Sequence, residues 1–314
     1  MTAPLAKEQF PALVANPRII YLDSAATAAR PQRVVDAVTA QLAGQAGNPG
    51  RGIYPWSTRT ARMIAETRER TAGFVGADGP DKIAFVSGTT AGLNAVAMSW
   101  GLANLRDGDE ILFSPVGHAS NVYPWVHLRQ LLARFGTNIA LVPYAVTATG
   151  AADPADIAVK VSSRTRLIVA THIHNLCGSM TTLAELSGRL DPSIRLCFDC
   201  SQSVGHVPVD VTSLGADFAA FSGHKMFGVP GTGVLYASRR VHGELGPSLP
   251  GGGGVRLADG ALRDLAMPEG LEGGTPDVAG IAGRAATMTR SGSACTCTTP
   301  SRTWTGSPTS SRSS

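Results

Sequence analysis

Short apolar runs alternate with longer amphipathic stretches along most of the chain. Runs of four such as residues 83–86 and 167–170 have the length and composition of buried strands, whereas residues 122–135 repeat apolar positions at helical spacing. The same patterns predict helices over residues 32–42, 58–74, 90–100 and 183–190, and strands over residues 19–22, 110–113, 139–142, 194–198 and 217–221. This alternation predicts an α/β domain with a mostly parallel central sheet and helices on both faces.

The composition is that of a globular enzyme. Of the 314 residues 43% are hydrophobic, and the net charge is only +4, with basic residues scattered along the chain. No basic stripe suggests nucleic-acid binding, no apolar run approaches the roughly 18 residues of a membrane span, and the N-terminus lacks the pattern of a signal peptide. We therefore expect a cytoplasmic protein with neither nucleic-acid nor membrane partners.

The five cysteines do not suggest a disulfide framework in a chain of this length. Cys197 and Cys200 form a C-x-x-C pair, but three residues apart on a strand their side chains would point to opposite faces. We predict buried thiols at these positions rather than a redox or zinc site.

The composition changes abruptly after about Met288. From Ser291 to Ser314 the chain is mostly Ser and Thr, with no apolar period. A reading-frame change would produce such a segment, and a genuine flexible tail is the alternative. We therefore divide the chain into a domain over residues 1–286, including an N-terminal segment, and a disordered or non-native tail over residues 287–314.

A lysine and an aspartate follow two of the predicted strands. Lys225 ends the sequence Ser222-Gly223-His224-Lys225 after one apolar run, and Asp199 ends another. A lysine desolvated beside a buried strand can present the neutral amine that attacks a carbonyl. Lysine and aspartate are also the two groups that pyridoxal phosphate (PLP) needs most. Considered alone, an ordinary surface lysine and a turn aspartate explain the pattern about as well.

A phosphate site is suggested by Ser87-Gly88-Thr89-Thr90, which lies between a predicted strand and a predicted helix. Small residues let the backbone approach a phosphate, and the free N–H groups of a helix start attract anions. The hydroxyls of Thr89 and Thr90 would add donors. A plain helix cap is the alternative, since threonine is common there.

Polar residues also follow two further strands. His118 would lie flat on a cofactor ring or occupy a surface loop. His172 and His174 are two residues apart and would point to one face of a strand, but no third ligand is evident, so no metal site is predicted. Asn175 is the better candidate, as an amide at the edge of a cofactor.

Taken together, the order and spacing of these motifs resemble the class V aminotransferase family of fold-type I PLP enzymes. The similarity runs from about residue 20 to residue 279, and the branch it most resembles contains the SUF-type cysteine desulfurases and selenocysteine lyases. The resemblance is carried by residues 21–27, 51–53, 87–94, 118–121, 175–178, 199–203, 221–225 and 273–276.

The resemblance implies a role for each matching residue. Lys225 would hold PLP covalently and later shuttle protons, Asp199 would pair with the pyridinium nitrogen, and His118 would stack on the ring. Further cofactor contacts are implied at Gly88, Thr89, Thr90, Asn175, Gln202, Ser222 and His224, and at Thr275 reaching across from a partner subunit. Arg51 and Asn175 are the candidate substrate contacts.

These roles imply a homodimer that converts L-cysteine into L-alanine and passes the sulfur to an acceptor protein, for iron–sulfur cluster or other sulfur-compound biosynthesis. The chain departs from the family in Gly117-His118-Ala119 and in the loop after the lysine. It also ends before the C-terminal domain in which desulfurases carry the nucleophilic cysteine and the substrate-binding arginine. Another class V reaction, such as transamination, epimerisation or β-lyase chemistry, and a catalytically inactive PLP-binding remnant are the alternatives.

Overall fold

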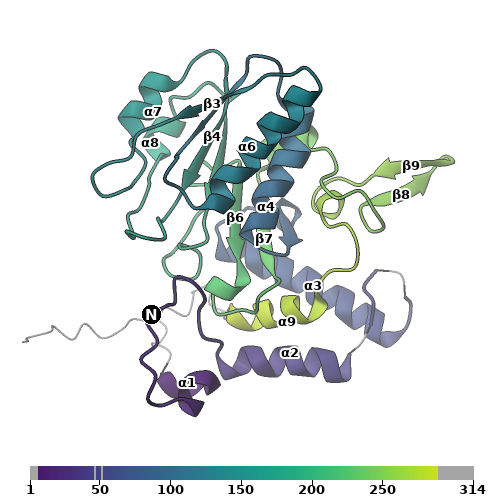
Figure 1. Ribbon diagram of the computed structural model, residues 1–314. Helices are drawn as coiled ribbons and strands as arrows, with labels where there is room; N and C mark the ends of the chain where they lie inside the picture. Colours follow the sequence, from purple (N-terminus) through teal and green to yellow (C-terminus); the bar gives the residue numbers. More distant parts are fainter. Residues whose placement is uncertain (1–5, 46, 51, 289–314) are drawn as a thin grey trace, which may run out of the picture.

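The fold is seen in a computed structural model, which describes residues 6–45, 47–50 and 52–288 (Figure 1). In this part of the chain, seven strands form one sheet in the order β1-β7-β6-β5-β4-β2-β3. The strand β7 runs antiparallel to both of its neighbours, and the other pairs are parallel. The strands are β1 (Ile83–Val86), β2 (Glu110–Phe113), β3 (Ala140–Pro143), β4 (Thr165–Thr171), β5 (Arg195–Asp199), β6 (Phe218–Ser222) and β7 (Gly233–Ala237).

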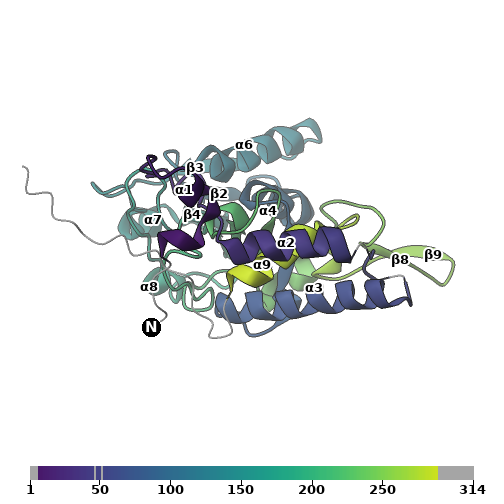
Figure 2. The same cartoon turned by 90° about the horizontal axis from the view of Figure 1, so that it is seen from below.

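Helices cover both faces of this sheet, as the sequence predicts. One face packs against α4 (Thr89–Val96) and α6 (Ala119–Arg134), whose residues Leu93 and Trp125 are fully buried there. The other face carries α3 (Pro55–Phe74), α7 (Pro154–Lys160), the short α8 (Ala184–Ser187) and α9 (Val278–Thr287). Outside these, α2 (Gln32–Gly44) lies along α9 (Figure 2). The mostly parallel three-layer α/β architecture is therefore confirmed.

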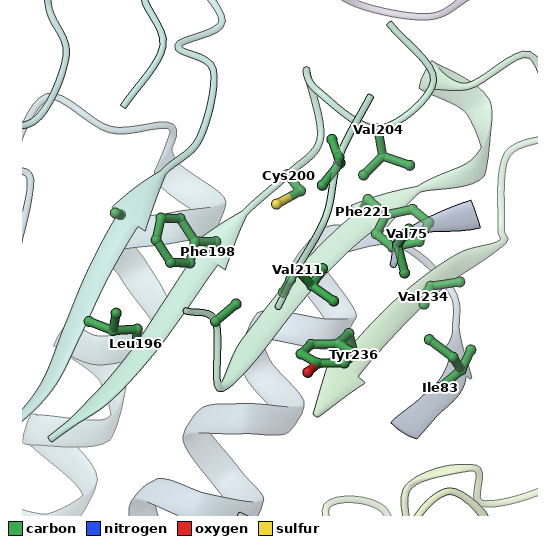
Figure 3. Close-up of a cluster of buried hydrophobic side chains, with 14 of the residues drawn as sticks. Val75, Ile83, Leu196, Phe198, Cys200, Val204, Val211, Phe221, Val234 and Tyr236 are labelled. Carbon is green, nitrogen blue, oxygen red and sulfur yellow. The ribbon is translucent and has the colours of Figure 1, made fainter. Parts of the chain in front are cut away.

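Alternate residues of each strand enter the two separate cores. In β5, Leu196 and Phe198 join the cluster drawn in Figure 3, whereas Cys197 packs on the opposite face with Phe218. Cys200 lies with the first cluster, so the predicted separation of the two cysteines across the sheet is confirmed. Burial raises the pKa of Cys200 to about 12 and that of Cys197 well above its ordinary value, which keeps both thiols protonated and unreactive at neutral pH.

Some predicted elements are wrong or differ in extent. Residues 19–22 form no strand: Ile20 and Leu22 are both 84% exposed, and no neighbouring strand pairs with their backbone. The helix expected to run through residue 100 leaves α geometry at Val96 and continues as a π-helical turn over Ala97–Gly101, before α5 (Leu102–Asn104). The strand β7, helix α7 and helix α9 were not predicted.

The remaining elements are small. A hairpin of β8 (Val255–Ala258) and β9 (Ala261–Asp264) projects from the body of the molecule (Figure 1). Near the N-terminus lies α1 (Pro11–Ala15). Short 3-10 helices occur at Lys7–Gln9, Pro80–Lys82, Gly223–Lys225, Arg239–Glu244 and Glu269–Leu271. None of the helices in the described residues is both long and apolar enough to cross a membrane.

The expected boundary at residue 286 falls within the last turn of α9. Thr287 and Met288, the last described residues, are both buried, and Met288 packs in the core cluster of Figure 3. The rest of the predicted tail, residues 289–314, lies outside the described residues.

Candidate functional site

A cavity of about 490 Å³ opens where the parallel strands end. Thr171, Asp199 and Ser222 are the last residues of β4, β5 and β6, and all three line it. Thr89 enters from the turn after β1, and His118 from the turn after β2. Because parallel strands end at one edge of the sheet, residues far apart in the sequence meet there, which is where open α/β sheets bind ligands.

Lys225 and Asp199 both line this cavity. Lys225 is half-buried in the 3-10 turn after β6, and its ammonium makes no hydrogen bond or ion pair with any described residue. Asp199 is only 4% exposed, and its Oδ1 accepts a hydrogen bond from the backbone N–H of Ser201 at 2.9 Å. The cavity thus presents an unpaired amine and an oriented, buried carboxyl group.

Three buried hydroxyl groups form a chain at one end of the cavity. The hydroxyls of Ser201 and Thr89 lie 2.7 Å apart, and those of Thr89 and Ser222 lie 2.8 Å apart. The backbone N–H of Thr89, at the start of α4, also donates to Ser222 Oγ at 2.9 Å. A Cβ on Gly233 would come within 2.4 Å of Gly88 Cα, so a glycine there lets β7 lie against this turn.

A smaller cavity of about 260 Å³ lies beside the hydroxyl chain. Its lining includes Gly88, Thr90, Ser222 and His224, four of the predicted cofactor contacts. Burial, and then the positive charges of Lys225 and Arg30, lowers the pKa of His224. This corner therefore combines a helix start, hydroxyl donors and excess positive charge, a combination that suits a phosphate dianion.

His118 and Asn175 lie on two loops that a third residue ties together. His174 is 9% exposed, and its Nδ1 accepts from the backbone N–H of Leu176 at 3.3 Å. The other ring nitrogen, Nε2, must then carry the proton, and it donates to Val116 O at 3.1 Å. His174 thereby joins the loop that bears Asn175 to the loop that bears His118.

His118 also caps α6, where its Nδ1 accepts from the backbone N–H of Ser120 at 3.1 Å. Ser120 in turn shares a 2.7 Å hydrogen bond with Thr90, so the starts of α4 and α6 are linked beside the cavity. Among the described residues, no group of three or more His, Cys, Asp or Glu side chains is placed to hold a metal ion.

Part of the N-terminal segment forms a wall of the cavity, with Asp23, Ala25 and Ala26 among its lining. Gln202, a predicted cofactor contact, donates from Nε2 to Ala25 O at 2.8 Å while lining the cavity. The backbone N–H of Ala28 donates to His224 O at 2.9 Å. The segment is therefore attached to the turn that carries Lys225.

Among the described residues, the predicted contact Thr275 lines neither of these two cavities. Thr275 is exposed and lines a separate cavity of about 480 Å³, together with Ser87 and Asn94. Arg51 lies outside the described residues. Conversely, Ser201 and Ser120 were not predicted as site residues. Their positions beside Asp199 and His118 in the motifs were the only signal that could have found them.

These residues fit PLP group by group. The hydroxyl chain and the positive corner suit its phosphate, the buried carboxyl group of Asp199 suits its ring nitrogen, and the unpaired Lys225 suits its aldehyde. Fold and site together define the class of fold-type I PLP proteins, whose cysteine desulfurase members share this architecture.

The chain belongs to the aminotransferase class-V family, which it matches over residues 20–301. A cysteine desulfurase of Escherichia coli is 35% identical over 275 residues, which are 86% of this chain and 66% of the relative. The apo structure of a cysteine desulfurase from Thermococcus onnurineus NA1 superposes with a TM-score of 0.82 at 30% identity, covering 91% of this chain and 70% of that one.

A structure of the cystine C-S lyase C-DES with its product cysteine persulfide is similar at a TM-score of 0.74 and 26% identity, covering 88% of this chain and 72% of that one. The family is PLP-dependent. The chain spans about two thirds of the length of the curated relatives, 66% of the Escherichia coli desulfurase.

Proposed function

We propose that this chain is the cofactor-binding part of a cysteine desulfurase-like enzyme, which converts L-cysteine into L-alanine and transferable sulfur. The observation that carries the proposal is the convergence of Lys225, Asp199 and the Thr89–Ser222 hydroxyls on one cavity at the strand ends. The similarity to desulfurases over most of this chain supports the substrate class.

Each residue would have a separate task. Thr89, Ser222 and His224 would hold the phosphate, and the carboxylate of Asp199 would accept a hydrogen bond from the protonated ring nitrogen and so keep it protonated. His118 would cover one face of the ring, and Lys225 Nζ would anchor the cofactor and carry a proton to or from the substrate Cα. When bound, PLP supplies an electron sink that stabilises the negative charge left on that Cα.

Asn175 and Gln202 would orient the cofactor edge and the substrate. Asn175 is well placed for this because His174 fixes its loop through both ring nitrogens. Arg51 remains our candidate for the substrate carboxylate, by its place in the sequence alone.

The group that accepts the sulfur would come from elsewhere. Among the described cysteines, Cys197 and Cys200 are buried with raised pKa values, and the exposed Cys177 does not line the cavity. Attack on the substrate sulfur requires a thiolate. We therefore propose that a cysteine outside the described residues, or a separate acceptor protein, takes the sulfur.

The experiment that tests the cofactor role is a spectroscopic titration. Purified chain mixed with PLP is expected to develop a visible absorbance band, and Lys225→Ala is expected to abolish it. Lys160→Ala is the matched control, because Lys160 is partly exposed and does not line the cavity. This variant should leave the band unchanged. A wild type that stays colourless and retains no PLP would refute the proposal.

A second measurement assigns the reaction. Alanine and sulfide released from cysteine are assayed beside amino-group transfer to a keto acid. Among the described residues no thiol reaches the cavity, which favours chemistry without a nucleophilic cysteine as the second candidate, such as the lyase reaction of C-DES. Amino-group transfer, or β-elimination with pyruvate in place of alanine, would establish this second candidate.

A third candidate is an inactive PLP-binding remnant, motivated by the absence of a thiol in the cavity among the described residues. Cysteine turnover comparable to that of full-length relatives would exclude it. Turnover only when the C-terminal domain of a full-length relative is appended would support it.

We propose a homodimer for this chain, in which Thr275 completes the phosphate site of the partner subunit. Thr275 is exposed and lies outside the cavity that holds Lys225, so it is available to a second copy. Light scattering on the PLP-loaded chain should give twice the monomer mass, and a monomer that binds PLP fully would contradict this assignment.

A further inference from the structure

Arg284 is a buried cation that the proposed mechanism does not use. It lies in α9, is only 1% exposed, and is among the largest fully buried side chains. Its Nη1 lies 3.3 Å from Met226 Sδ, and its Cζ lies 5.8 Å from the centre of the Phe221 ring. Nε and Nη2 have no hydrogen-bond partner among the described residues. A buried charge without a counter-ion is costly, so a buried arginine at this position needs a physical reason.

The guanidinium lies directly behind the turn that carries Lys225. A Cβ on Gly223 would come within 3.1 Å of Arg284 Nη2, so the charge sits against the backbone between Ser222 and His224. Those two side chains line the smaller cavity, whereas Gly223 and Arg284 do not. One residue of backbone therefore separates the guanidinium from the residues assigned to the phosphate.

Arg284 remains a cation in this setting. Burial lowers its pKa to about 10, which still leaves the group protonated at neutral pH. The other positive charges near this corner, Lys225 and Arg30, are only partly buried, and solvent screens them more.

We propose that Arg284 is the buried counter-charge of the cofactor phosphate, acting through the backbone of Gly223 without touching the ligand. It is a positioning residue, and the inference rests on the proposed binding of PLP. A dianion in the smaller cavity would neutralise a charge that is uncompensated among the described residues. Because Arg284 is 1% exposed, its charge is screened less by solvent than a surface charge would be.

This role predicts that removing the charge lowers the affinity for PLP but does not lower the stability of the apoprotein. The variant Arg284→Met keeps much of the side-chain volume, so the apoprotein should unfold at the same or a higher temperature. Coulomb's law gives a factor of about 200 or more for a dianion ~10 Å away at an effective dielectric near 20. Screening by salt and water lowers this factor, so the affinity for PLP should fall by at least ~10-fold. If Arg284 only filled space, its substitution would lower the unfolding temperature and the affinity for PLP together.

The test compares PLP with pyridoxal, which has the same ring and aldehyde but no phosphate. Dissociation constants are measured by absorbance for wild type, Arg284→Met, Arg284→Lys and the surface control Arg164→Met, at a residue whose side chain is 67% exposed. We expect Arg284→Met to lose affinity for PLP but to stay within two-fold for pyridoxal. Arg284→Lys, which keeps the charge, should retain most of the PLP affinity.

An unchanged ratio of PLP to pyridoxal affinity in Arg284→Met would overturn the inference, as would equal losses for both ligands. If the wild type binds no PLP, the proposed function fails, but the inference is still tested with inorganic phosphate. Phosphate should then raise the melting temperature of wild type and Arg284→Lys more than that of Arg284→Met. Equal increases would refute the role of Arg284.

Discussion

Glu272 provides the sharpest test of how this fold is held together. Its carboxylate accepts hydrogen bonds from both terminal nitrogens of Arg68 in α3, and Nη2 lies 2.8 Å from Oε2. It also accepts a hydrogen bond from the backbone N–H of Phe85 in β1 at 2.5 Å. Arg68 also donates to Ile83 O and stacks 4.7 Å from the centre of the Phe85 ring. One carboxylate thus attaches the longest helix and an edge strand to the segment that precedes Thr275.

The variant Glu272→Gln removes the charge with little change in shape. The side chains of Arg68 and Glu272 are only 12% and 13% exposed, so the variant leaves a nearly buried guanidinium without its counter-ion. Breaking such a pair costs about 3–5 kcal/mol, and its slight exposure places the expected loss near the lower end, about 3 kcal/mol. For a domain of this size that loss corresponds to a fall in Tm of roughly 6–12 °C.

Urea unfolding and thermal melts of the two proteins measure this effect. The matched control is Arg239→Gln, which breaks an ion pair with Asp81 whose side chains are 73% and 37% exposed. Exposed pairs of this kind contribute about 0–1 kcal/mol. If Glu272→Gln lowers the free energy of unfolding by less than about 1 kcal/mol, or if the two variants lower it equally, the buried ion pair does not stabilise the fold.

Two further predictions concern histidines. Burial lowers the pKa of His172, so the native state binds fewer protons than the unfolded state, and stability should fall as the pH drops below the ordinary histidine value of about 6.5. His172→Phe should weaken this dependence in urea unfolding between pH 5.5 and 7.5, and an unchanged dependence would contradict the assignment. His174→Ala should weaken cysteine binding more than PLP binding, because it frees the loop that bears Asn175, whereas His174→Gln should recover part of the loss. Equal effects on both ligands would point to general loosening of the site.

The sequence predicts the parts of the site that follow buried parallel strands. Such strands are short apolar runs, and the polar residue that ends each run, as Asp199 ends β5, is recognisable without knowing its neighbours. The pairing of these strands determines which of the strand-end residues become neighbours. Thr171, for example, lies beside Asp199 in the register of β4 and β5. The presence of the site was therefore predictable, whereas its hydrogen bonds were not.

Elements whose stability depends on distant packing escaped prediction. Helix α9 contains Gly280 and Gly283, which lower its helix propensity, and it forms where it packs against α2 and α3. A Cβ on Gly283 would come within 2.8 Å of Val38, so the small residue permits that close packing. Arg284 follows directly, and nothing in the local pattern marks an arginine for complete burial.

The described residues divide the proposed reaction into two parts. Every group assigned to touch the cofactor within one subunit lies between Gly88 and Lys225, and sheet ends, helix starts or backbone hydrogen bonds hold most of these groups in place. The thiol that would take the sulfur has no counterpart among these residues. Binding the cofactor and accepting the sulfur should therefore be separable. A chain that binds PLP with normal affinity but releases alanine only when an external thiol is supplied is the behaviour this division predicts, and alanine formation independent of added thiol would contradict it.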